Sequence, residues 1–517
     1  MTPATVPALL AEQARVHGDR TALIGNDGTG VYRRIGFAGL WARACAIAGR
    51  LGDTVGRTRD GGASRVCWIY GNANGLTALT IYHGVLAAGG VNVPVNPAST
   101  PAEVEAVLAL VRPALVIAPA ATLAGVSLGD VPGLAIEDLG ALEAWAPSGV
   151  PGTPPGLAAE PDDTAAVLLT SGTTGRSKGV VHSHRSSLAA GAGWNAAFGH
   201  TSADVYQSMF PVYAGAGLHF SGLNCLLTGT TYVVDETRPT SASLRRVDEY
   251  GATVYGAVPS IYQYWLAEDL AEHDLSTLRL LDFGGAVMHR STIEALRERI
   301  PRVELIQTYG LTEAGPGGLF LPPEHLDAKL GSIGCVATDG LRFRVDPAAA
   351  SAEEGAAGTH GELCLSGTSV MSGYLGDPES TARVFDGEWL RTGDLVRVDD
   401  EGFVYFVDRL KDIIIRGGLN ISSLEVEETL LAHPGVQQVA AYGHPHESLG
   451  EVVAVAIVPA SGGLDLADLR RFATERLARP KVPARVVLVD ALPVSAAGKV
   501  LKSALRERDD FVEEWEG

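Results

Sequence analysis

Hydrophobic and polar positions alternate along the first part of the chain in a rhythm that is typical of parallel α/β sheets. Short apolar runs predict buried strands at Val66–Ile69, Val91–Val93 and Leu115–Ile117. Stretches with helical periodicity lie between or beyond them, for example at 75–88 and 101–111. Because strands that alternate with helices pack as parallel sheets covered by those helices, the pattern predicts an α/β fold.

The same rhythm resumes after a loop rich in proline and glycine at 146–163. From about 331 to 408 helical stretches become scarce, and short β-like runs predict a smaller antiparallel unit. After Asp408 the pattern predicts a small α+β domain with helices at 423–432 and 465–478. The strands expected in the second half of the α/β part are Tyr232–Val234, Thr253–Ala257, Leu278–Phe283 and Val303–Gln307.

Composition and charge narrow the class of protein. The chain has 517 residues, of which 46% are hydrophobic, and its length predicts roughly three or four folding units. A net charge of −20 argues against nucleic acid or an anionic membrane as the main partner. The five cysteines are far apart and form no CxxC pair, which favours a reducing cytosol. No apolar run reaches the ~18 residues that span a bilayer, so we expect a cytoplasmic protein.

The segment from Leu168 to Val181, LLTSGTTGRSKGVV, carries the most specific chemistry. An apolar run at Ala165–Leu169 predicts a buried strand that leads into a loop of threonine, serine and glycine. Glycines let the backbone approach a ligand, successive N–H groups wrap an anion, and Lys178 adds positive charge. The loop predicts a phosphate cradle. It differs from a Walker A loop, because Lys178 follows Ser177 instead of glycine.

Two further motifs each carry a carboxylate, one after a predicted strand and one after a glycine turn. Tyr309–Gly315, YGLTEAG, follows a strand end, where α/β sheets place ligands. Its Thr312 hydroxyl and Glu313 carboxylate are hard oxygen donors of the kind that Mg²⁺ prefers, and the Tyr309 ring offers a face on which a base stacks. In RTGDL, Asp394 follows a glycine turn and could accept hydrogen bonds from two ribose hydroxyls, although a turn aspartate is the commoner reading.

The last two motifs indicate a moving part. Asp408-Arg409 and Lys411-Asp412 lie on either side of one leucine and precede a Gly417-Gly418 pair, which is the pattern of a hinge that carries a glycine loop. Near the C-terminus, Lys499 follows glycine and could reach a buried anion as a point charge. Taken alone, such a lysine is more often a solubilising surface residue.

Together, in residues, order and spacing, these motifs resemble the adenylate-forming superfamily over residues of about 5 to 510. This superfamily contains acyl- and aryl-CoA synthetases, adenylation domains of nonribosomal peptide synthetases, and beetle luciferases. The resemblance implies a large N-terminal domain at 1–409, built from two α/β subdomains and a distorted β-barrel. It also implies a small mobile α+β domain at 412–517, with the hinge at Lys411.

The implied reaction has two halves. With ATP and Mg²⁺, a carboxylic acid forms an acyl-adenylate and pyrophosphate leaves, and then a thiol such as that of coenzyme A attacks the acyl carbon and releases AMP. Preplaced cations and dipoles neutralise the crowded negative charge of the first step. The resemblance implies small-molecule partners, no nucleic acid or membrane, and a monomer or homodimer.

The resemblance also implies a role for individual residues. The β- and γ-phosphates would be held by Thr170, Ser171, Gly172, Thr173, Thr174 and Lys178. The adenine would be framed by Gly284, Gly285, Ala286 and Tyr309, and the ribose would be held by Asp394 and Arg409. Thr312 would contact the α-phosphate, Glu313 would bind Mg²⁺, and Lys499 would stabilise the adenylation transition state. The acid pocket would contain Tyr213, Ala214, Gly215, Gly285 and Gly310, and the CoA tunnel would contain Gly417 and Gly418.

Two positions depart from the family pattern. Ala214 stands where most relatives carry an aromatic residue or histidine that closes over the acid, and Ala497 replaces a hydroxyl residue before the Gly-Lys pair. Loss of one such polar contact costs about 1–3 kcal/mol. One hypothesis is therefore an enzyme that performs mainly the thioesterification half-reaction. The small residues also favour a bulky, mostly apolar acid, with a composition rich in glycine and alanine as the plain alternative.

The resemblance leaves several functions open. An acyl-CoA ligase using free CoA fits best, because the chain ends shortly after Lys499 without a carrier domain. Alternatives are a stand-alone adenylation enzyme that loads a separate carrier protein, a luciferase-like oxygenase, and a non-catalytic protein that binds nucleotide or acyl-adenylate. His182 and His184 are read as ordinary polar residues at a helix start, since no further metal ligands accompany them.

Overall fold

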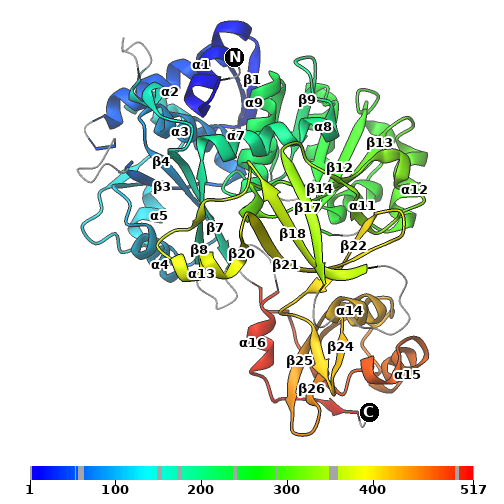
Figure 1. Cartoon of the computed structure of the whole chain (residues 1–517). Helices are drawn as coiled ribbons and strands as arrows, with labels where there is room; N and C mark the ends of the chain where they lie inside the picture. The colour runs from blue at the N-terminus through cyan, green and yellow to red at the C-terminus, as the bar shows by residue number, and fades with distance from the viewer. Residues whose placement is uncertain are drawn as a thin grey trace. The chain divides into compact units, whose positions relative to one another are not determined.

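The computed structural model describes residues 3–52, 54–55, 63–147, 154–171, 177–236, 241–286, 288–347, 359–494 and 500–515 (Figure 1). The chain forms two compact units. The first contains Met1–Arg342 and Leu365–Leu390, and the second contains Phe343–Cys364 and Arg391–Gly517. The sequence predicts two domains, 1–409 and 412–517, that move about a hinge at Lys411. Those domain limits stay a prediction.

The larger sheet of the first unit joins nine strands within the described ranges, in the order β16-β14-β13-β12-β11-β9-β10-β1-β2. Strands β1 and β9 to β13 are parallel, while β2, β14 and β16 join through antiparallel pairings. All four strands expected in the second half of the α/β part are confirmed. The strands are β1 (Thr21–Asn26), β2 (Tyr32–Gly36), β9 (Val205–Ser208), β10 (Thr231–Val234), β11 (Val254–Ala257), β12 (Leu280–Gly284), β13 (Glu304–Gly310), β14 (Gly318–Leu321) and β16 (Val336–Ala337).

The second sheet of this unit runs in the order β19-β8-β7-β4-β3-β5-β6. Its central strands β3 and β4 are nearly or fully buried, which explains why they read as continuous apolar runs. Strands β7 and β8 form an antiparallel hairpin at one side of the sheet. The strands are β3 (Arg65–Ile69), β4 (Val91–Val95), β5 (Leu115–Ala118), β6 (Gly133–Ala135), β7 (Thr164–Ser171), β8 (Ser177–Ser183) and β19 (Gly373–Tyr374).

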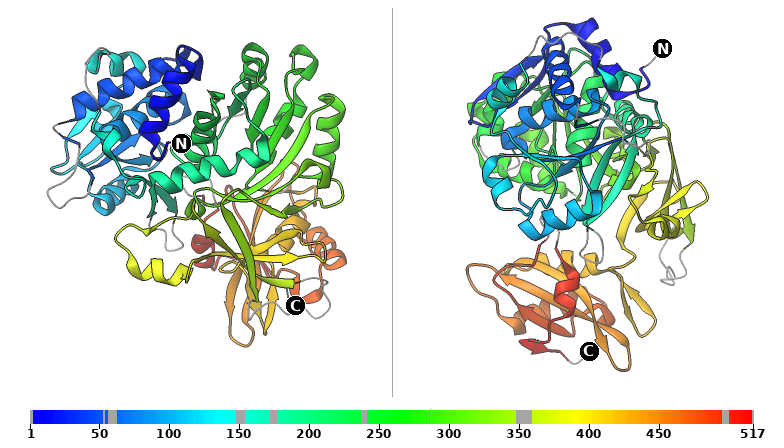
Figure 2. Two further views of the ribbon diagram at one scale, coloured as in Figure 1. Left: turned by 45° about the horizontal axis from the view of Figure 1, so that its top comes forward. Right: turned by 90° about the vertical axis from the view of Figure 1, so that its left-hand side faces the viewer.

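Helices cover these sheets, as the views of the first unit in Figure 2 show. Helix α4 begins with a capping box in which Thr100 and Glu103 each satisfy the other's backbone N–H, with Pro101 in the first turn. Helix α3 is buried along its whole length, and Gly84 lets it approach helix α2, because a Cβ there would lie 2.5 Å from an Ile47 methyl. The larger helices are α1 (Val6–His17), α2 (Phe37–Leu51), α3 (Gly75–Ala87), α4 (Pro101–Val111), α7 (His184–Gly193), α10 (Ser241–Tyr250), α11 (Pro259–Ala267) and α12 (Arg290–Arg299).

Shorter elements complete the first unit. The segment Ala216–Leu223, η3, is a π-helix, and a 3₁₀ turn, η5, spans Thr312–Ala314. No helix within the described ranges is long and apolar enough to cross a membrane. The remaining short elements are α5 (Ala120–Ala124), α6 (Leu139–Trp145), α8 (Asn195–Phe198), α9 (Asn224–Thr228), α13 (Pro378–Val384), β15 (Ser332–Gly334) and β20 (Phe385–Asp386), with 3₁₀ turns η1 (Asn72–Asn74), η2 (Pro155–Ala158), η4 (Leu270–Glu272) and η6 (Pro323–His325).

The second unit begins with strands in the order β22-β21-β18-β17. The antiparallel unit expected in this part of the chain is confirmed. The pairings between the described residues leave this sheet open, so a closed barrel is not seen where the resemblance implied a distorted one. The strands are β17 (Leu341–Pro347), β18 (Thr359–Gly367), β21 (Trp389–Val398) and β22 (Val404–Arg409).

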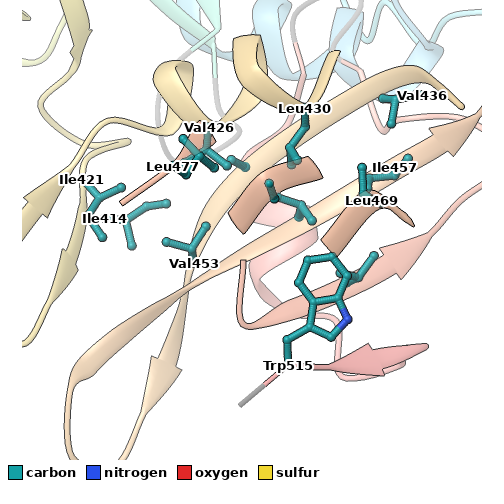
Figure 3. Packing of buried hydrophobic residues seen from close by; sticks show 14 residues of the cluster. Ile414, Ile421, Val426, Leu430, Val436, Val453, Ile457, Leu469, Leu477 and Trp515 are labelled. Atoms are coloured by element: carbon teal, nitrogen blue, oxygen red, sulfur yellow. The ribbon is translucent and has the colours of Figure 1, made fainter. Parts of the chain in front are cut away.

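The C-terminal part is a small α+β fold with its own core. Its sheet runs β24-β23-β26-β27-β28, and β25 pairs with β26. Figure 3 shows Val426 and Leu430 from α14 packed with Val453 and Ile457 of β26, near Trp515. Both predicted helices are confirmed. The elements are β23 (Ile414–Arg416), β24 (Leu419–Ile421), α14 (Ser423–Leu431), β25 (Val436–His446), β26 (Gly450–Pro459), α15 (Leu466–Arg476), η7 (Arg479–Lys481), β27 (Arg485–Leu488), α16 (Lys502–Arg506) and β28 (Glu513–Glu514).

Candidate active site

The predicted phosphate loop connects the two strands of the β7–β8 hairpin. The apolar run before it is a buried strand, as predicted, and Thr170 lies opposite Lys178 in the antiparallel register. Ser171 pairs with Ser177 at the end of the hairpin. The loop's Gly172, Thr173 and Thr174 lie outside the described residues, so their phosphate-binding role stays a prediction. The hairpin thus places Lys178 at the base of the loop.

Lys178 is linked to Glu313 through a tyrosine that the sequence interpretation missed. The Lys178 ammonium lies 4.4 Å from the centre of the Tyr374 ring, and Tyr374 pairs with Val180 of the same hairpin. The Tyr374 hydroxyl donates a hydrogen bond to Glu313 Oε1 at 3.1 Å. Burial and the nearby Glu313 carboxylate raise the pKa of Tyr374, so the hydroxyl keeps its proton. No spacing or composition signal marked Tyr374.

Glu313 and Thr312 lie in the tight turn η5 that follows β13. The backbone N–H of Met371 donates to the Glu313 carbonyl at 2.8 Å. Gly310 has no room for a side chain, because a Cβ would lie 2.4 Å from the Pro316 carbonyl oxygen. Gly315 ends the turn at φ 105°, a conformation that favours glycine. The chain therefore doubles back sharply and leaves the Thr312 and Glu313 side chains half-buried at the strand end.

Two buried histidines hold the main chain of this turn. His182 Nε2 lies 2.8 Å from the Thr312 carbonyl oxygen, and His219 Nδ1 lies 3.0 Å from the Gly315 carbonyl oxygen. Both side chains are fully buried, and their rings meet edge to face with centres 5.5 Å apart. Burial lowers the pKa of His182 to about 4 and that of His219 to about 3.

The placement of His182 and His184 at a helix start was wrong for His182, which lies on β8. His184 does begin helix α7, but both side chains are buried, and His184 Nδ1 accepts a hydrogen bond from the Val6 backbone N–H at 3.4 Å. A polar residue beside an apolar strand gives no sequence signal for burial, because only the fold determines what packs against it. His219 drew no attention in the sequence for the same reason.

The predicted adenine frame lies at the end of β12. Gly284 is buried, and a Cβ there would lie 2.6 Å from the Thr308 hydroxyl oxygen, so glycine is required by close packing. Gly285 has φ 78° and, with Ala286, is exposed, while Tyr309 is half-buried on the neighbouring strand β13. The structure therefore brings these residues to adjacent strand ends, and their role toward adenine stays a prediction.

Asp282 lies directly before this frame and was missed by the sequence interpretation. Its side chain is fully buried on β12, and the Thr308 hydroxyl donates to its Oδ1 at 2.7 Å. Its Oδ2 has no hydrogen-bond partner among the described residues. Burial raises the pKa of Asp282 to about 8, so the carboxyl group is mostly protonated at pH 7. The sequence signal that could have drawn attention to Asp282 was a single acidic residue within an apolar strand.

The predicted acid pocket centres on the segment before η3. Tyr213 and Ala214 are half-buried, and burial raises the pKa of Tyr213. A Cβ on Gly215 would lie 3.3 Å from a Leu168 methyl and 3.4 Å from Pro316 Cδ, so this segment meets both the phosphate strand and the chain after η5. Close packing thus accounts for Gly215, which weakens the argument from small residues to a roomy pocket.

The predicted ribose contacts lie in the second unit. Asp394 on β21 and Arg409 on β22 are opposite one another in the register, and Arg409 Nε lies 2.6 Å from Asp394 Oδ1. Asp394 is fully buried, whereas the Arg409 side chain is 42% exposed. The strand pair therefore fixes the carboxylate and leaves the guanidinium edge open to solvent. The role of this pair toward ribose stays a prediction.

The predicted hinge and glycine loop lie on consecutive short segments. Lys411 is exposed in the turn between β22 and β23, where the Asp412 N–H donates to the Arg409 carbonyl at 2.8 Å. Gly417 and Gly418, with φ of 58° and 86°, form the exposed tip of the β23–β24 hairpin. These conformations explain the glycine pair. Lys499 lies outside the described residues, as does Ala497, so their roles stay predictions.

Comparison with known proteins extends over nearly the whole chain. Residues 10–375 match the family described as AMP-binding enzyme, and residues 425–499 match the AMP-binding enzyme C-terminal domain. The chain is 34% identical over 527 residues to a Mycobacterium tuberculosis protein named "3-[(3aS,4S,7aS)-7a-methyl-1,5-dioxo-octahydro-1H-inden-4-yl]propanoyl:CoA ligase", a match that covers 97% of this chain and 98% of that protein. It is 31% identical over 481 residues to a long-chain-fatty-acid–CoA ligase of M. tuberculosis, which covers 90% and 92% of the two chains. The solved structure of ATP-bound MatB from Rhodopseudomonas palustris has a TM-score of 0.82 at 28% identity and covers 96% and 98% of the two chains.

Proposed function

The chain belongs to the AMP-binding enzyme family, and we propose that it is an AMP-forming acyl-CoA ligase for a bulky, mostly apolar carboxylic acid. Pairwise likeness to curated CoA ligases over nearly the full length supports the acid–thiol ligase class. The structural observation that carries the proposal is the connection of Lys178, Tyr374 and Glu313 at the ends of the β7–β8 hairpin and β13. It brings a cation and a carboxylate to the same tyrosine side chain, which suits a metal-bound triphosphate.

In the first half-reaction, a carboxylate oxygen attacks the α-phosphorus, the bond to the β-phosphate breaks, and pyrophosphate leaves. Lys178 and the backbone of the phosphate loop would hold the leaving phosphates, and Thr312 would donate to the α-phosphate. Mg²⁺ fits the donors present, since Glu313 offers one carboxylate and Mg²⁺ commonly takes one or two carboxylates along with substrate phosphates. When bound, it would neutralise negative charge on the departing pyrophosphate.

In the second half-reaction, the sulfur of a thiolate attacks the acyl carbon, the bond to the AMP oxygen breaks, and AMP leaves with both electrons of that bond. The thiol gives its proton to solvent before or during attack. Gly417 and Gly418 form an exposed turn with no side chain to obstruct a slender thiol arm. We propose that they line the thiol's path after the part beyond Lys411 has rotated. Domain limits of 1–409 and 412–517 belong to this proposal.

The proposed acid class rests on one relative in particular. The M. tuberculosis protein that is 34% identical is named for a propanoate attached to a methylated, dioxygenated bicyclic ring. We infer a fused-ring or similarly bulky acid for this chain, with long-chain fatty acids as the second class because another relative is named for them. The pocket would contain Tyr213, Ala214, Gly215, Gly285 and Gly310.

The test is pyrophosphate release with ATP, Mg²⁺ and a panel of short, long, aromatic and fused-ring acids, each with and without CoA. The proposal expects CoA-dependent thioester with fused-ring or long-chain acids and poor turnover of acetate. Acetate as the preferred acid would overturn the bulky-acid class. Binding of ATP without turnover of any acid would overturn the ligase and leave a nucleotide-binding protein.

A second candidate function is an enzyme that performs mainly thioesterification. It rests on Ala214 and Ala497, which stand where most relatives carry residues that serve adenylation. A chemically made acyl-adenylate supplied with CoA tests it. If thioester forms no faster from the adenylate than from acid and ATP, adenylation is not the weak step and this candidate fails. Thioester on a carrier protein but not on CoA would instead identify a stand-alone adenylation enzyme. We expect the protein to act in the cytoplasm as a monomer or homodimer.

A further inference from the structure

Two imidazoles from different elements hold two ends of one short turn. His182 comes from β8, which follows the phosphate loop, and His219 comes from η3, which follows the predicted acid-pocket segment. The Thr312 and Gly315 carbonyls, 2.8 Å and 3.0 Å from the imidazole nitrogens, lie at the beginning and just beyond the end of η5. The turn between them carries the Thr312 and Glu313 side chains. The histidines thus connect three segments that the proposed function assigns to substrate.

The contacts assign the proton on each ring. A carbonyl oxygen accepts only, so the nitrogen that faces it must carry hydrogen. His182 is therefore protonated on Nε2 and His219 on Nδ1. The remaining nitrogen of His182, Nδ1, lies 3.2 Å from the Ser186 hydroxyl oxygen. The lowered pKa values of both rings agree with neutral side chains, because burial disfavours the charged imidazolium.

We propose that His182 and His219 are positioning residues that fix the Thr312–Gly315 main chain and thereby aim Thr312 and Glu313 at the nucleotide. The inference rests on the proposed function, because it assumes that these two side chains meet phosphate and its metal. Carbonyl oxygens away from solvent need donors, and the Gly315 N–H within the same turn also donates to the Thr312 carbonyl at 3.0 Å. The imidazoles are the contacts that tie the turn to β8 and η3, and their loss leaves the turn free to move or to take up water. Small displacements of reacting groups cost large factors in rate.

Amide side chains offer a matched test of the two donors. The amide nitrogen of glutamine falls near the Nε2 position of histidine, and that of asparagine falls near the Nδ1 position. His182→Gln and His219→Asn should therefore keep the donor, whereas His182→Asn and His219→Gln should misplace it. Each pair introduces the same functional group at the same site, so differences in charge and polarity cancel.

The readouts are the affinity for AMP and for ATP with Mg²⁺ by calorimetry, together with kcat and KM for adenylation where an acid turns over. The proposal expects His182→Gln and His219→Asn to stay within about threefold of the wild type. His182→Asn and His219→Gln should lose about tenfold or more in kcat/KM, which is the effect of one lost buried hydrogen bond. Equal losses in both members of each pair would overturn the donor assignment.

A spectroscopic readout separates positioning from general stability. Protein labelled with ¹⁵N-histidine should give the Nε2–H tautomer for His182 and the Nδ1–H tautomer for His219 at pH 7, with each signal assigned by its loss in the variants. The opposite tautomers would overturn the inference. A wild type that bound neither AMP nor ATP would overturn the proposed function, and this inference with it. Nucleotide binding that all four variants retained unchanged would overturn this inference alone.

Discussion

The Tyr374 hydroxyl donates a hydrogen bond to the Glu313 carboxylate at 3.1 Å, while the same ring lies under the Lys178 ammonium. One side chain therefore meets both the proposed phosphate-binding cation and the proposed metal ligand. The hydroxyl restrains the carboxylate before nucleotide arrives, and the ring face holds the lysine near the loop. These two functions can be separated by substitution.

Tyr374→Phe removes the hydroxyl and keeps the ring. We expect KM for ATP with Mg²⁺ to rise about three- to tenfold, because one hydrogen bond to a charged group is lost. Tyr374→Leu also removes the ring face, so it should lose a further few-fold through Lys178. Steady-state kinetics at varied Mg²⁺ check this order. Identical losses in both variants would show that the ring face adds nothing, and no loss in Tyr374→Phe would show that the hydroxyl does not matter. A Phe variant worse than the Leu variant would contradict the scheme.

Asp282 predicts an unusual dependence of stability on pH. Its folded pKa of about 8 lies above the unfolded value of about 3.9, so between these limits the folded state holds a proton that the unfolded state has released. Stability from this group therefore falls as pH rises, by about 1.4 kcal/mol per pH unit. Asp282→Asn keeps the shape and removes the titration.

The measurement is urea unfolding of wild type and Asp282→Asn at pH 5, 6 and 7. The free energy of unfolding of the variant minus that of the wild type should increase at each step upward in pH. The variant should be the more stable protein at pH 7. A constant difference across this range would mean that Asp282 does not titrate between folded and unfolded states as proposed. Thr308→Val removes the hydrogen bond to Asp282 but keeps the titrating carboxyl group, so its free energy of unfolding should still fall as pH rises.

Gly284 is a test of close packing at the proposed adenine frame. In Gly284→Ala the new Cβ would lie 2.6 Å and 2.7 Å from the Thr308 hydroxyl and carbonyl oxygens, and the carbonyl cannot rotate away. We expect a loss of about 1–3 kcal/mol in the free energy of unfolding of the first unit. Gly125→Ala is the matched control, because its Cβ would lie 3.6 Å from the Thr122 carbonyl oxygen, which is an ordinary van der Waals contact. Equal stability of the two variants would contradict the packing argument.

The Asp394–Arg409 pair predicts that the affinity for AMP depends on the ribose hydroxyls. Asp394 is fully buried and paired, so Asp394→Asn should weaken AMP binding about tenfold or more if the carboxylate also accepts from ribose hydroxyls. Arg409→Lys keeps a positive charge and should bind AMP more tightly than Arg409→Leu. Calorimetry with AMP and with a 2′,3′-dideoxy analogue checks this. Asp394→Asn should lose little affinity for the analogue, and a uniform loss would contradict a ribose contact.

The local pattern of apolar and polar residues was sufficient to predict the alternation of strands and helices and the positions of most elements. Buried strands such as β3 and β4 read as apolar runs, because both faces of a parallel sheet are covered. The Gly417-Gly418 pair predicted a tight turn, and its positive φ angles supply the reason. The order of the motifs along the chain was sufficient to identify the family, and the family match over residues 10–375 confirms it.

What only the tertiary structure decided is which distant side chains meet. Tyr374 reaches Glu313 because β19 pairs with β8, and His219 reaches Gly315 because η3 packs against the chain after β13. Neither contact follows from sequence spacing, since pairing between remote strands and burial of a polar ring depend on the whole fold. Asp282 belongs to the same class, because its raised pKa arises from desolvation by neighbours that the sequence does not name. The sequence by itself determined the elements and the chemistry they carry, and the packing of those elements decided what holds that chemistry in place.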